Sequence, residues 1–414
     1  MKLAIVTTRF IDGDMRGGEE MSRTLFYFLK EKTRVSLLAS DMLSESYNLK
    51  DRRRNSCSGL VEGDGDVILF KTHFSSQRAV QILGQRAVRV LERGIPNGIS
   101  RKSLFAEIAK SFAWGPFAPG IYNAIKGSDY DVVFSSIFPT ATALISLKAS
   151  VDSGKPFVFT PYFHYAVPEH RNSTLIHFYT KRSSALIACT ESEKKALIDT
   201  GAIGEKIYVI PLSFDVSTIP LDLPPQESLK ESMGLKDYFV VLTHPWIQKG
   251  AIEVLKSVSM LVDRGKKVAV ISIGKPDKEY VAEETRLVSR NLNLKILDLG
   301  WLQGRKKWEA FSACDVFALP SRSDAFGISY LNAWALKKTV LAAKNTPAGE
   351  IVDDGINGML VDPGNPENLA LTLDNLINSD IRDMGKSGYQ KLLASYSPND
   401  MSERYLRVFE SVIR

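Results

Sequence analysis

The chain has 414 residues, which is more than one typical domain needs and enough to bury two hydrophobic cores. Apolar residues make up 44% and charged residues 24%, as in ordinary globular proteins, so neither a disordered nor a fibrous chain is indicated. The net charge of +6 comes from 53 basic and 47 acidic residues, and so mild an excess does not indicate a nucleic-acid-binding protein.

The first part of the chain alternates short apolar runs with amphipathic segments. Leu3–Thr8 is predicted to be a buried strand rather than a signal peptide, because it follows a single lysine and contains no long apolar core. Gly17 and Gly18 then open a helix predicted at Glu19–Lys30, and Arg34–Ala39 is the next strand. This start lacks the G-x-G-x-x-G fingerprint, which argues against a nicotinamide dehydrogenase.

Further apolar runs bounded by turn residues are predicted to continue a parallel sheet. They are Val67–Lys71, Asp131–Phe134, Pro156–Thr160, Ala185–Cys189 and Lys206–Pro211. A helix is predicted at Ala141–Ala149, and Thr190 with Glu193 forms the capping-box pattern that starts another helix. The first domain is therefore expected to span residues 1–215.

Histidines follow the predicted strand Pro156–Thr160. His164 stands at the strand end, where it is either a locally bonded loop residue or part of a site, and His170 and His177 come next. Their H-x5-H-x6-H spacing does not put three imidazoles on one face, so no zinc site is expected. No Asp-x-Asp pair occurs at a strand end either, and no metal is predicted.

Residues 78–117 interleave basic and apolar side chains. The cations are Arg78, Arg86, Arg89, Arg93, Arg101, Lys102 and Lys110. One interpretation is a set of ordinary amphipathic helices whose apolar faces lie in the core. The other is a basic, apolar-tipped surface that binds anionic lipid. The pattern alone leaves both open.

A Pro-rich stretch without periodicity, residues 216–226, is predicted to be the linker to a second α/β domain at residues 227–397. The predicted strands there are Tyr238–Thr243, Lys267–Gly274, Leu294–Leu299 and Thr339–Ala343. The predicted helices are Ala251–Arg264, Asp277–Arg290, Trp308–Ala313, Ile328–Lys337 and Leu369–Asn378. A final helix is predicted at residues 398–414.

The most informative stretch is Pro320–Pro363. Its loop, P-S-R-S-D-A, leads to Phe326 and Gly327 and then into the predicted helix. Ligands of parallel sheets bind at the carboxyl ends of the strands. A glycine at a helix start lets a backbone N–H approach a phosphate, and the helix dipole favours the anion. The stretch therefore predicts an anion site.

This stretch resembles the donor-binding signature of retaining GT-B glycosyltransferases of the group 1, family 4 type. The signature reads P-S-x-x-E-x-F-G, L-E-A-x-A and D-G-x-x-G-x-L-V-x-P, and Asp324 and Asn332 stand where it has its two glutamates. The resemblance implies two Rossmann-like domains with parallel sheets. The first would bind the acceptor, the second the nucleotide sugar, and the C-terminal helix would cross back to the first domain.

The resemblance also implies roles for single residues. Lys249 takes the place of a phosphate-binding lysine, and His244 that of an arginine five residues earlier. Asp324 would contact the donor sugar, Asn332 the ribose, and His164 would lie beside the donor sugar. The expected catalytic residues are thus His164, Lys249 and Asp324. The expected donor-binding residues are Gly17, Gly18, His244, Gly300, Phe326, Gly327, Ile328 and Asn332.

The function that the resemblance implies is transfer of a sugar, with retention, from a nucleotide sugar to a lipid-linked, polysaccharide or glycan acceptor. The nucleotide sugar would be a co-substrate, with no cofactor, no metal and no nucleic-acid partner. The scattered Cys57, Cys189 and Cys314 favour reduced thiols and a cytoplasmic protein, and residues 78–117 would suit the inner face of the cell membrane. The alternative is a catalytically degenerate GT-B protein that binds a nucleotide or a partner transferase without turnover.

Overall fold

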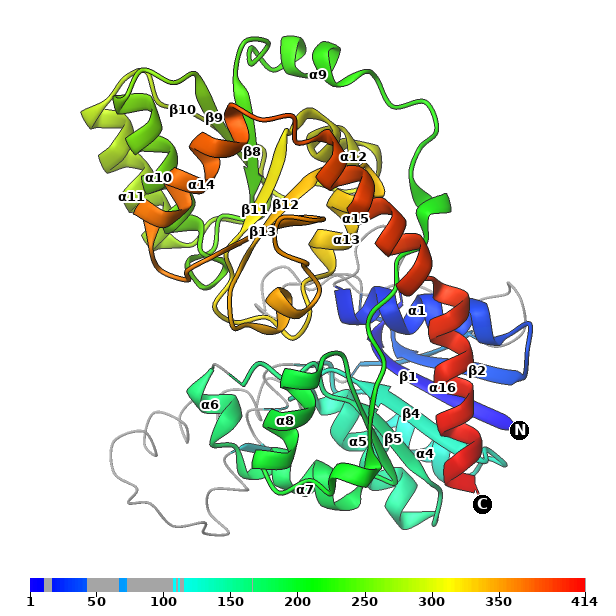
Figure 1. Cartoon of the computed structure of the whole chain (residues 1–414). Coiled ribbons are helices and arrows are strands. Elements are labelled where there is room, and N and C mark those ends of the chain that lie inside the picture. The colour runs from blue at the N-terminus through cyan, green and yellow to red at the C-terminus, as the bar shows by residue number, and fades with distance from the viewer. Residues whose placement is uncertain are drawn as a thin grey trace, which may run out of the picture. The chain divides into compact units, whose positions relative to one another are not determined.

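The computed structural model describes residues 1–10, 17–42, 67–72, 107–108, 111, 115–165 and 167–413. The chain forms two compact units, Met1–Leu212 with Pro398–Arg414, and Ser213–Ser397. The division falls next to the predicted linker at residues 216–226. Each unit is built on one parallel sheet with helices packed against it, which confirms the predicted α/β fold with two Rossmann-like domains (Figure 1).

The first unit contains a sheet of seven strands in the order β3-β2-β1-β4-β5-β6-β7. The strands are β1 (Lys2–Arg9), β2 (Arg34–Ser40), β3 (Val67–Phe70), β4 (Val132–Ser136), β5 (Phe157–Thr160), β6 (Ala185–Ala188) and β7 (Ile207–Val209). The helices are α1 (Gly17–Leu29), α4 (Gly120–Lys126), α5 (Ala141–Asp152), α6 (Pro168–Arg171), α7 (Thr174–Arg182), α8 (Glu191–Asp199), the short η1 (Gly204–Lys206) and α16 (Pro398–Ile413). Apolar side chains cover both faces of the central strands, as expected where helices pack on each side.

The second unit contains a sheet of six strands in the order β10-β9-β8-β11-β12-β13. The strands are β8 (Phe239–Thr243), β9 (Val268–Ser272), β10 (Lys295–Asp298), β11 (Val316–Leu319), β12 (Thr339–Ala343) and β13 (Gly358–Val361). The helices are η2 (Val216–Thr218), α9 (Gln226–Ser232), η3 (Ile247–Lys249), α10 (Ala251–Asp263), α11 (Lys278–Arg290), α12 (Gly304–Ala313), α13 (Ile328–Ala335), η4 (Pro347–Glu350), α14 (Pro366–Ile377) and α15 (Arg382–Ser395). The strand order reverses between β8 and β11, where ligands of such sheets bind.

The C-terminal helix α16 packs on the first unit, so the predicted return of the chain to the first domain is confirmed. The Tyr405 ring lies 5.5 Å from that of Phe134 on β4, and the Phe409 ring lies 5.7 Å from it. Tyr405 Oη also lies 3.1 Å from Thr160 Oγ1 at the end of β5. The helix therefore supplies part of the first unit's core.

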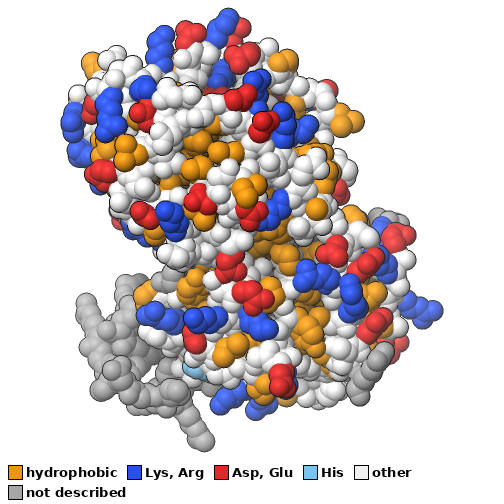
Figure 2. Space-filling model, in the orientation of Figure 1, with side chains coloured by type: hydrophobic (Ala, Val, Ile, Leu, Met, Phe, Trp, Pro, Cys, Tyr) orange, Lys and Arg blue, Asp and Glu red, His pale blue; other side chains and the backbone are white. Residues whose placement is uncertain are grey.

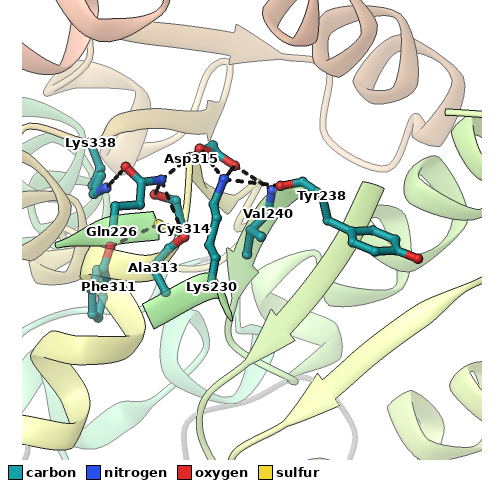
Figure 3. Close-up of polar contacts among 9 residues, drawn as sticks. All are labelled: Gln226, Lys230, Tyr238, Val240, Phe311, Ala313, Cys314, Asp315 and Lys338. Carbon is teal, nitrogen blue, oxygen red and sulfur yellow. Dashed lines mark hydrogen bonds and ion pairs between the residues drawn. The ribbon is translucent and has the colours of Figure 1, made fainter. Parts of the chain in front are cut away.

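A partly buried polar cluster joins α9 to the start of β11 in the second unit (Figure 3). Lys230 donates to Asp315 Oδ2 at 2.7 Å, and the backbone N–H of Val240 donates to the same oxygen at 2.7 Å. Gln226 donates to Asp315 Oδ1 at 2.8 Å and accepts from Lys338 at 3.0 Å. Because Asp315 precedes β11, the cluster lies at the amino ends of the strands and anchors the fold.

Charged side chains of both signs are interspersed on the face drawn in Figure 2. The seven cations of the predicted lipid-binding surface at residues 78–117 lie outside the described residues. Within the part of the chain that the structure describes, no helix combines the length and the apolar character that crossing a membrane requires.

Candidate functional site

Two loops of the second unit meet at the carboxyl edge of its sheet, because β8 and β11 are paired neighbours. One loop follows β8 and contains Lys249. The other follows β11 and contains Asp324. The backbone N–H of Arg322 donates to the carbonyl oxygen of Gln248 at 3.1 Å, and the Ser321 hydroxyl donates to the same oxygen at 3.3 Å. These bonds hold the two loops together.

Gly250 permits this close approach. Its φ is +79°, a left-handed conformation, and a Cβ on it would lie 2.5 Å from the carbonyl oxygen of Pro320. Any larger residue would therefore strain its own backbone and push the loops apart. The glycine after Lys249 is therefore required by the geometry of these loops.

The structure brings two of the predicted catalytic residues into direct contact. Lys249 Nζ lies 2.7 Å from Asp324 Oδ1, and the two side chains are only 16% and 11% exposed. The Lys249 ammonium is therefore held inside the site rather than extended into solvent. In this state the two opposite charges neutralise one another.

Next to this pair, helix α13 begins at a glycine. Gly327 has φ +97° and ψ +60° and caps the helix. The first backbone N–H groups of a helix have no partner within the helix, so those of Ile328 and Ser329 can bind an anion, whereas that of Tyr330 donates to the carbonyl oxygen of Gly327 at 3.0 Å. Phe326 is 2% exposed, and its ring packs 5.8 Å from that of Tyr396, so its side chain serves the core. Asn332 lies further along α13 and is 5% exposed.

His244 is held in one tautomer. Its Nδ1 lies 2.9 Å from the carbonyl oxygen of Ile273, and its Nε2 lies 2.9 Å from Ser329 Oγ on α13. A carbonyl oxygen can only accept, so Nδ1 carries the proton. Burial lowers the pKa of His244 to about 4. The ring is therefore neutral near pH 7, and Nε2 accepts from the Ser329 hydroxyl.

The neutral His244 does not supply the charge of an arginine at this position. It instead joins the loop after β8 to the start of α13 through Ser329. Ser329 was not singled out from the sequence, because a serine in a first helical turn has no distinctive pattern, and only the fold puts it beside His244.

Gly300 lies after β10, at the same edge of the sheet. Its φ is +66°, and its carbonyl oxygen accepts from the N–H of Gly274 at 2.7 Å. Gly274 has φ +127°, a conformation that is essentially restricted to glycine. The bond joins the loops that follow β9 and β10. The side chain of Trp301, next to Gly300, is 47% exposed.

The remaining predicted residues belong to the first unit. Gly17 and Gly18 begin α1, and a Cβ on Gly18 would lie 2.8 Å from Ile137 Cγ1 and 2.9 Å from Tyr162 Cε2. Ile137 and Tyr162 both have left-handed backbones, with φ of +73° and +50°. Such strain in non-glycine residues is concentrated at functional sites.

His164 lies on the loop that follows β5. The preceding backbone N–H, that of Phe163, donates to the Glu193 carboxylate at 2.5 Å. The His164 ring lies 6.0 Å from that of His170, in an edge-to-face arrangement. Glu193 is fully buried, and the sequence had indicated only a helix-capping role for it.

Comparison with known families gives one match for each half of the chain. Residues 57–218 match the family described as Glycosyltransferase Family 4. Residues 234–391 match the family described as Glycosyl transferases group 1. The first match ends shortly after the division between the units, at residue 218, and the second match lies within the second unit.

Individual relatives match this chain over part of its length. A D-inositol 3-phosphate glycosyltransferase of Xylanimonas cellulosilytica is 27% identical over 213 residues, which are 48% of this chain and 50% of the relative. An alpha-maltose-1-phosphate synthase of Mycolicibacterium smegmatis is 27% identical over 227 residues, 50% of this chain and 57% of the relative. The matches thus span about half of the length of these relatives.

Solved structures match the whole fold. Anabaena Alr3699/HepE in complex with UDP and glucose superposes with a TM-score of 0.71 at 18% identity, covering 99% of this chain and 100% of that one. Sucrose-phosphate synthase from Thermosynechococcus elongatus gives a TM-score of 0.69 at 15% identity, covering 99% and 98%. At these identities the likeness establishes the fold.

Proposed function

Because the chain belongs to the group 1 GT-B glycosyltransferases, we propose that it transfers a sugar from a nucleotide-sugar donor to an acceptor. The observation that carries the proposal is the Lys249–Asp324 pair, which lies at the carboxyl edge of the sheet beside the glycine-capped start of α13. An ammonium group and exposed backbone N–H groups are what a diphosphate leaving group requires.

The donor diphosphate would bind Lys249 and the first turn of α13. To do so it competes with Asp324 for the ammonium group, because both are anions. Once the diphosphate holds Lys249, the Asp324 carboxylate can accept hydrogen bonds from the sugar hydroxyls. Diphosphate and sugar are then recognised together, since the phosphate contact releases the group that binds the sugar.

Other parts of the donor would bind groups nearby. Asn332 would bind the ribose through a neutral amide, which lacks the charge assistance of a glutamate. The neutral His244 would orient Ser329 at the helix start. The loop containing Gly300 and Trp301 would face the base. UDP-glucose is the first donor to test, since the structurally similar HepE was solved with UDP and glucose.

The remaining features of the proposal follow from the family. The reaction would retain the anomeric configuration and need no metal, because Lys249 and the helix N-terminus stabilise the departing diphosphate. The leaving phosphate would take the proton of the acceptor hydroxyl, and His164 would lie beside the donor sugar. The acceptor would be a lipid-linked saccharide, a polysaccharide or another glycan, with residues 78–117 available for contact with an anionic membrane.

Turnover of nucleotide sugars tests the proposal. The purified protein would be incubated with UDP-, GDP- and ADP-sugars and acceptor extracts, and release of the nucleoside diphosphate would be measured together with thermal stabilisation. We expect one donor both to stabilise the protein and to be consumed. Chemical shifts of the product's anomeric proton would then report retention, and EDTA should leave the rate unchanged.

A second candidate is a degenerate GT-B protein that binds a nucleotide or a partner transferase without turnover. Three replacements favour it: aspartate and asparagine at the two glutamate positions, and a neutral histidine where an arginine is expected. Stabilisation by a nucleotide without consumption of any donor, in the presence of every acceptor extract, would support this candidate and contradict the enzyme.

A further inference from the structure

Glu193 joins the ends of two neighbouring strands in the first unit. Its carboxylate accepts from the backbone N–H of Phe163, after β5, at 2.5 Å, and from that of Cys189, after β6, at 2.6 Å. The side chain is 0% exposed. A buried carboxylate is costly unless it is satisfied, so these two bonds are worth more than a surface pair would be.

Helix capping does not account for this arrangement. In a capping box, the carboxylate bonds the N–H of the cap residue itself, which here is Thr190. Thr190 Oγ1 does accept from the N–H of Glu193 at 3.1 Å, so half of the predicted box is present. The carboxylate instead bonds Cys189, one residue before the cap, and Phe163, which lies 30 residues earlier in the chain.

The segment that Glu193 holds is strained. Tyr162, next to Phe163, has φ +50°, in the left-handed region, and its ring lies against Gly18. On the other side of the strand end, Thr160 bonds Tyr405 of α16 at 3.1 Å. A strained backbone persists only where its surroundings fix it. His164 follows Phe163 directly, so the bonds to Thr160 and Phe163 also set the position of His164.

We infer that Glu193 is a positioning residue for His164: it fixes the backbone from which the His164 side chain extends. This inference rests on the proposed function, in which His164 lies beside the donor sugar. Glu193 itself is buried and touches neither substrate.

Electrostatics make this contact sensitive to pH. The titratable groups that face the carboxylate are Tyr162, Cys189 and Tyr405, and burial raises the pKa of each, so all three stay neutral near pH 7. Burial also raises the pKa of Glu193, to about 7. An ionised carboxylate is the stronger acceptor, so the hydrogen bond from the Phe163 N–H to Glu193 strengthens as the pH rises through this value.

Kinetics of Glu193→Gln give the first test. The amide keeps one acceptor oxygen but presents an N–H2 group to a backbone donor, which loosens one of the two bonds. We expect kcat to fall by about 10- to 100-fold, as for a misplaced catalytic group, with the donor KM changed by less than about threefold. The KM should hold because the proposed contacts to the donor diphosphate, Lys249 and the start of α13, belong to the second unit, which the substitution does not touch. The dependence of kcat on pH near 7 should also disappear.

The matched control is Glu191→Gln, which removes the same charge from an exposed position on the same helical turn. It should leave kcat, KM and the pH profile as in the wild type. A Glu193→Gln enzyme with unchanged kcat, or one whose donor KM rises as steeply as kcat falls, would overturn the inference.

Hydrogen exchange of the wild-type protein gives a second test, which needs no variant to fold. Protection of the Phe163 and Cys189 amides, corrected for intrinsic rates, should increase as the pH rises through about 7. Protection that does not change with pH would contradict the inference that ionised Glu193 holds these two amides. If the wild-type protein consumes no nucleotide sugar, the proposed function fails, whereas the exchange measurement still decides whether Glu193 holds this segment.

Discussion

At the level of single residues, Lys249 Nζ and Asp324 Oδ1 form an ion pair at 2.7 Å. A ligand anion must therefore displace a carboxylate before it reaches the ammonium. This competition gives the two residues opposite effects on diphosphate binding, although both would serve the same reaction. Two substitutions follow from it.

Lys249→Ala should weaken donor binding by about 2 kcal/mol, because a charged hydrogen-bond donor to the diphosphate is lost. Isothermal titration with the donor found in the turnover screen measures the effect. Lys386→Ala is the control, since this lysine of α15 is 64% exposed and pairs only at the surface, with Asp383. Equal donor affinity in the Lys249 variant and the wild type would remove Lys249 from the site.

Asp324→Asn should act in the opposite direction on the nucleoside diphosphate alone. Removing the carboxylate frees Lys249 and removes a like charge, so UDP or its counterpart should bind several-fold more tightly. Turnover of the nucleotide sugar should fall, because the sugar hydroxyls lose a charged acceptor. Titration and initial rates on the same preparation separate the two effects, and weaker binding of the diphosphate would contradict the competition.

His244 should make the second unit sensitive to acid. An unfolded histidine titrates near pH 6.5, whereas burial lowers the folded pKa of His244 to about 4. The folded state thus disfavours the cation. The stability that this group contributes is fully present above pH 6.5, and it is lost as the pH falls through about 4.

His244→Asn tests this dependence, because asparagine keeps an N–H donor but cannot be protonated. Urea unfolding from about pH 7 down to about pH 4.5 should show a smaller loss of stability in the variant than in the wild type. Other titrating groups cancel in the difference between the two curves. If stability fell equally with pH in the variant and the wild type, the lowered folded-state pKa of His244 would be contradicted.

At the level of elements, the start of α1 depends on close packing against two loops of the first unit. A Cβ on Gly18 would lie 2.8 Å from Ile137 Cγ1 and 2.9 Å from Tyr162 Cε2. Both neighbours have left-handed backbones and so have little freedom to move. The glycine is needed here for space, because its φ is not in the left-handed region.

Gly18→Ala should therefore destabilise the first unit by about 1–3 kcal/mol, the usual cost of overpacking. Denaturant unfolding followed by circular dichroism measures the change. Gly204→Ala is the control, since a Cβ there would meet Ile198 Cδ1 at an ordinary 3.4 Å. If Gly18→Ala left the stability of the first unit unchanged, α1 would be able to move away from Ile137 and Tyr162 at no cost.

The helices and strands differ in how well the sequence predicted them. Buried strands such as β1 and β12 were predicted to within a residue or so, because continuous apolar runs between turn residues leave few alternatives. Helices α4, α6, α7, α9 and α15 were not predicted. In α7, TLIHFYTKR mixes polar and aromatic residues without a clear period, and packing on α5 rather than propensity stabilises it.

At the level of the whole molecule, the chain returns to its first unit through α16. Phe409 is fully buried and packs on Phe134 of β4, so Phe409→Ala should cost the first unit about 3–5 kcal/mol. Four of the five tryptophans belong to the second unit: Trp246, Trp301, Trp308 and Trp334. Tryptophan fluorescence therefore reports mainly on the second unit, whereas circular dichroism reports on both. The unfolding transition followed by circular dichroism should therefore shift much more than the one followed by tryptophan fluorescence.

Ile413→Ala is the control for this prediction, because Ile413 lies on the same helix and is 44% exposed. It should leave both transitions close to those of the wild type. Equal shifts of the two signals in Phe409→Ala would mean that the two units unfold together.

The sequence by itself determined the fold class of this protein and located the loop that we propose to bind the donor diphosphate. Buried strands that alternate with helices favour parallel sheets covered by helices, and the P-S-x-x-D-x-F-G frame lies within one continuous segment. Such features depend on residues close together in the chain, and local periodicity and turn chemistry encode them directly.

Only the tertiary structure decided which groups meet and how they are charged. The Lys249–Asp324 pair, the neutral His244 and the bond from Phe163 to Glu193 all join segments that follow different strands. Strand order brings those segments together, and burial sets the pKa of His244 and of Glu193. Neither the order of the strands nor the depth of burial is contained in any local pattern, because both arise from the packing of the whole unit.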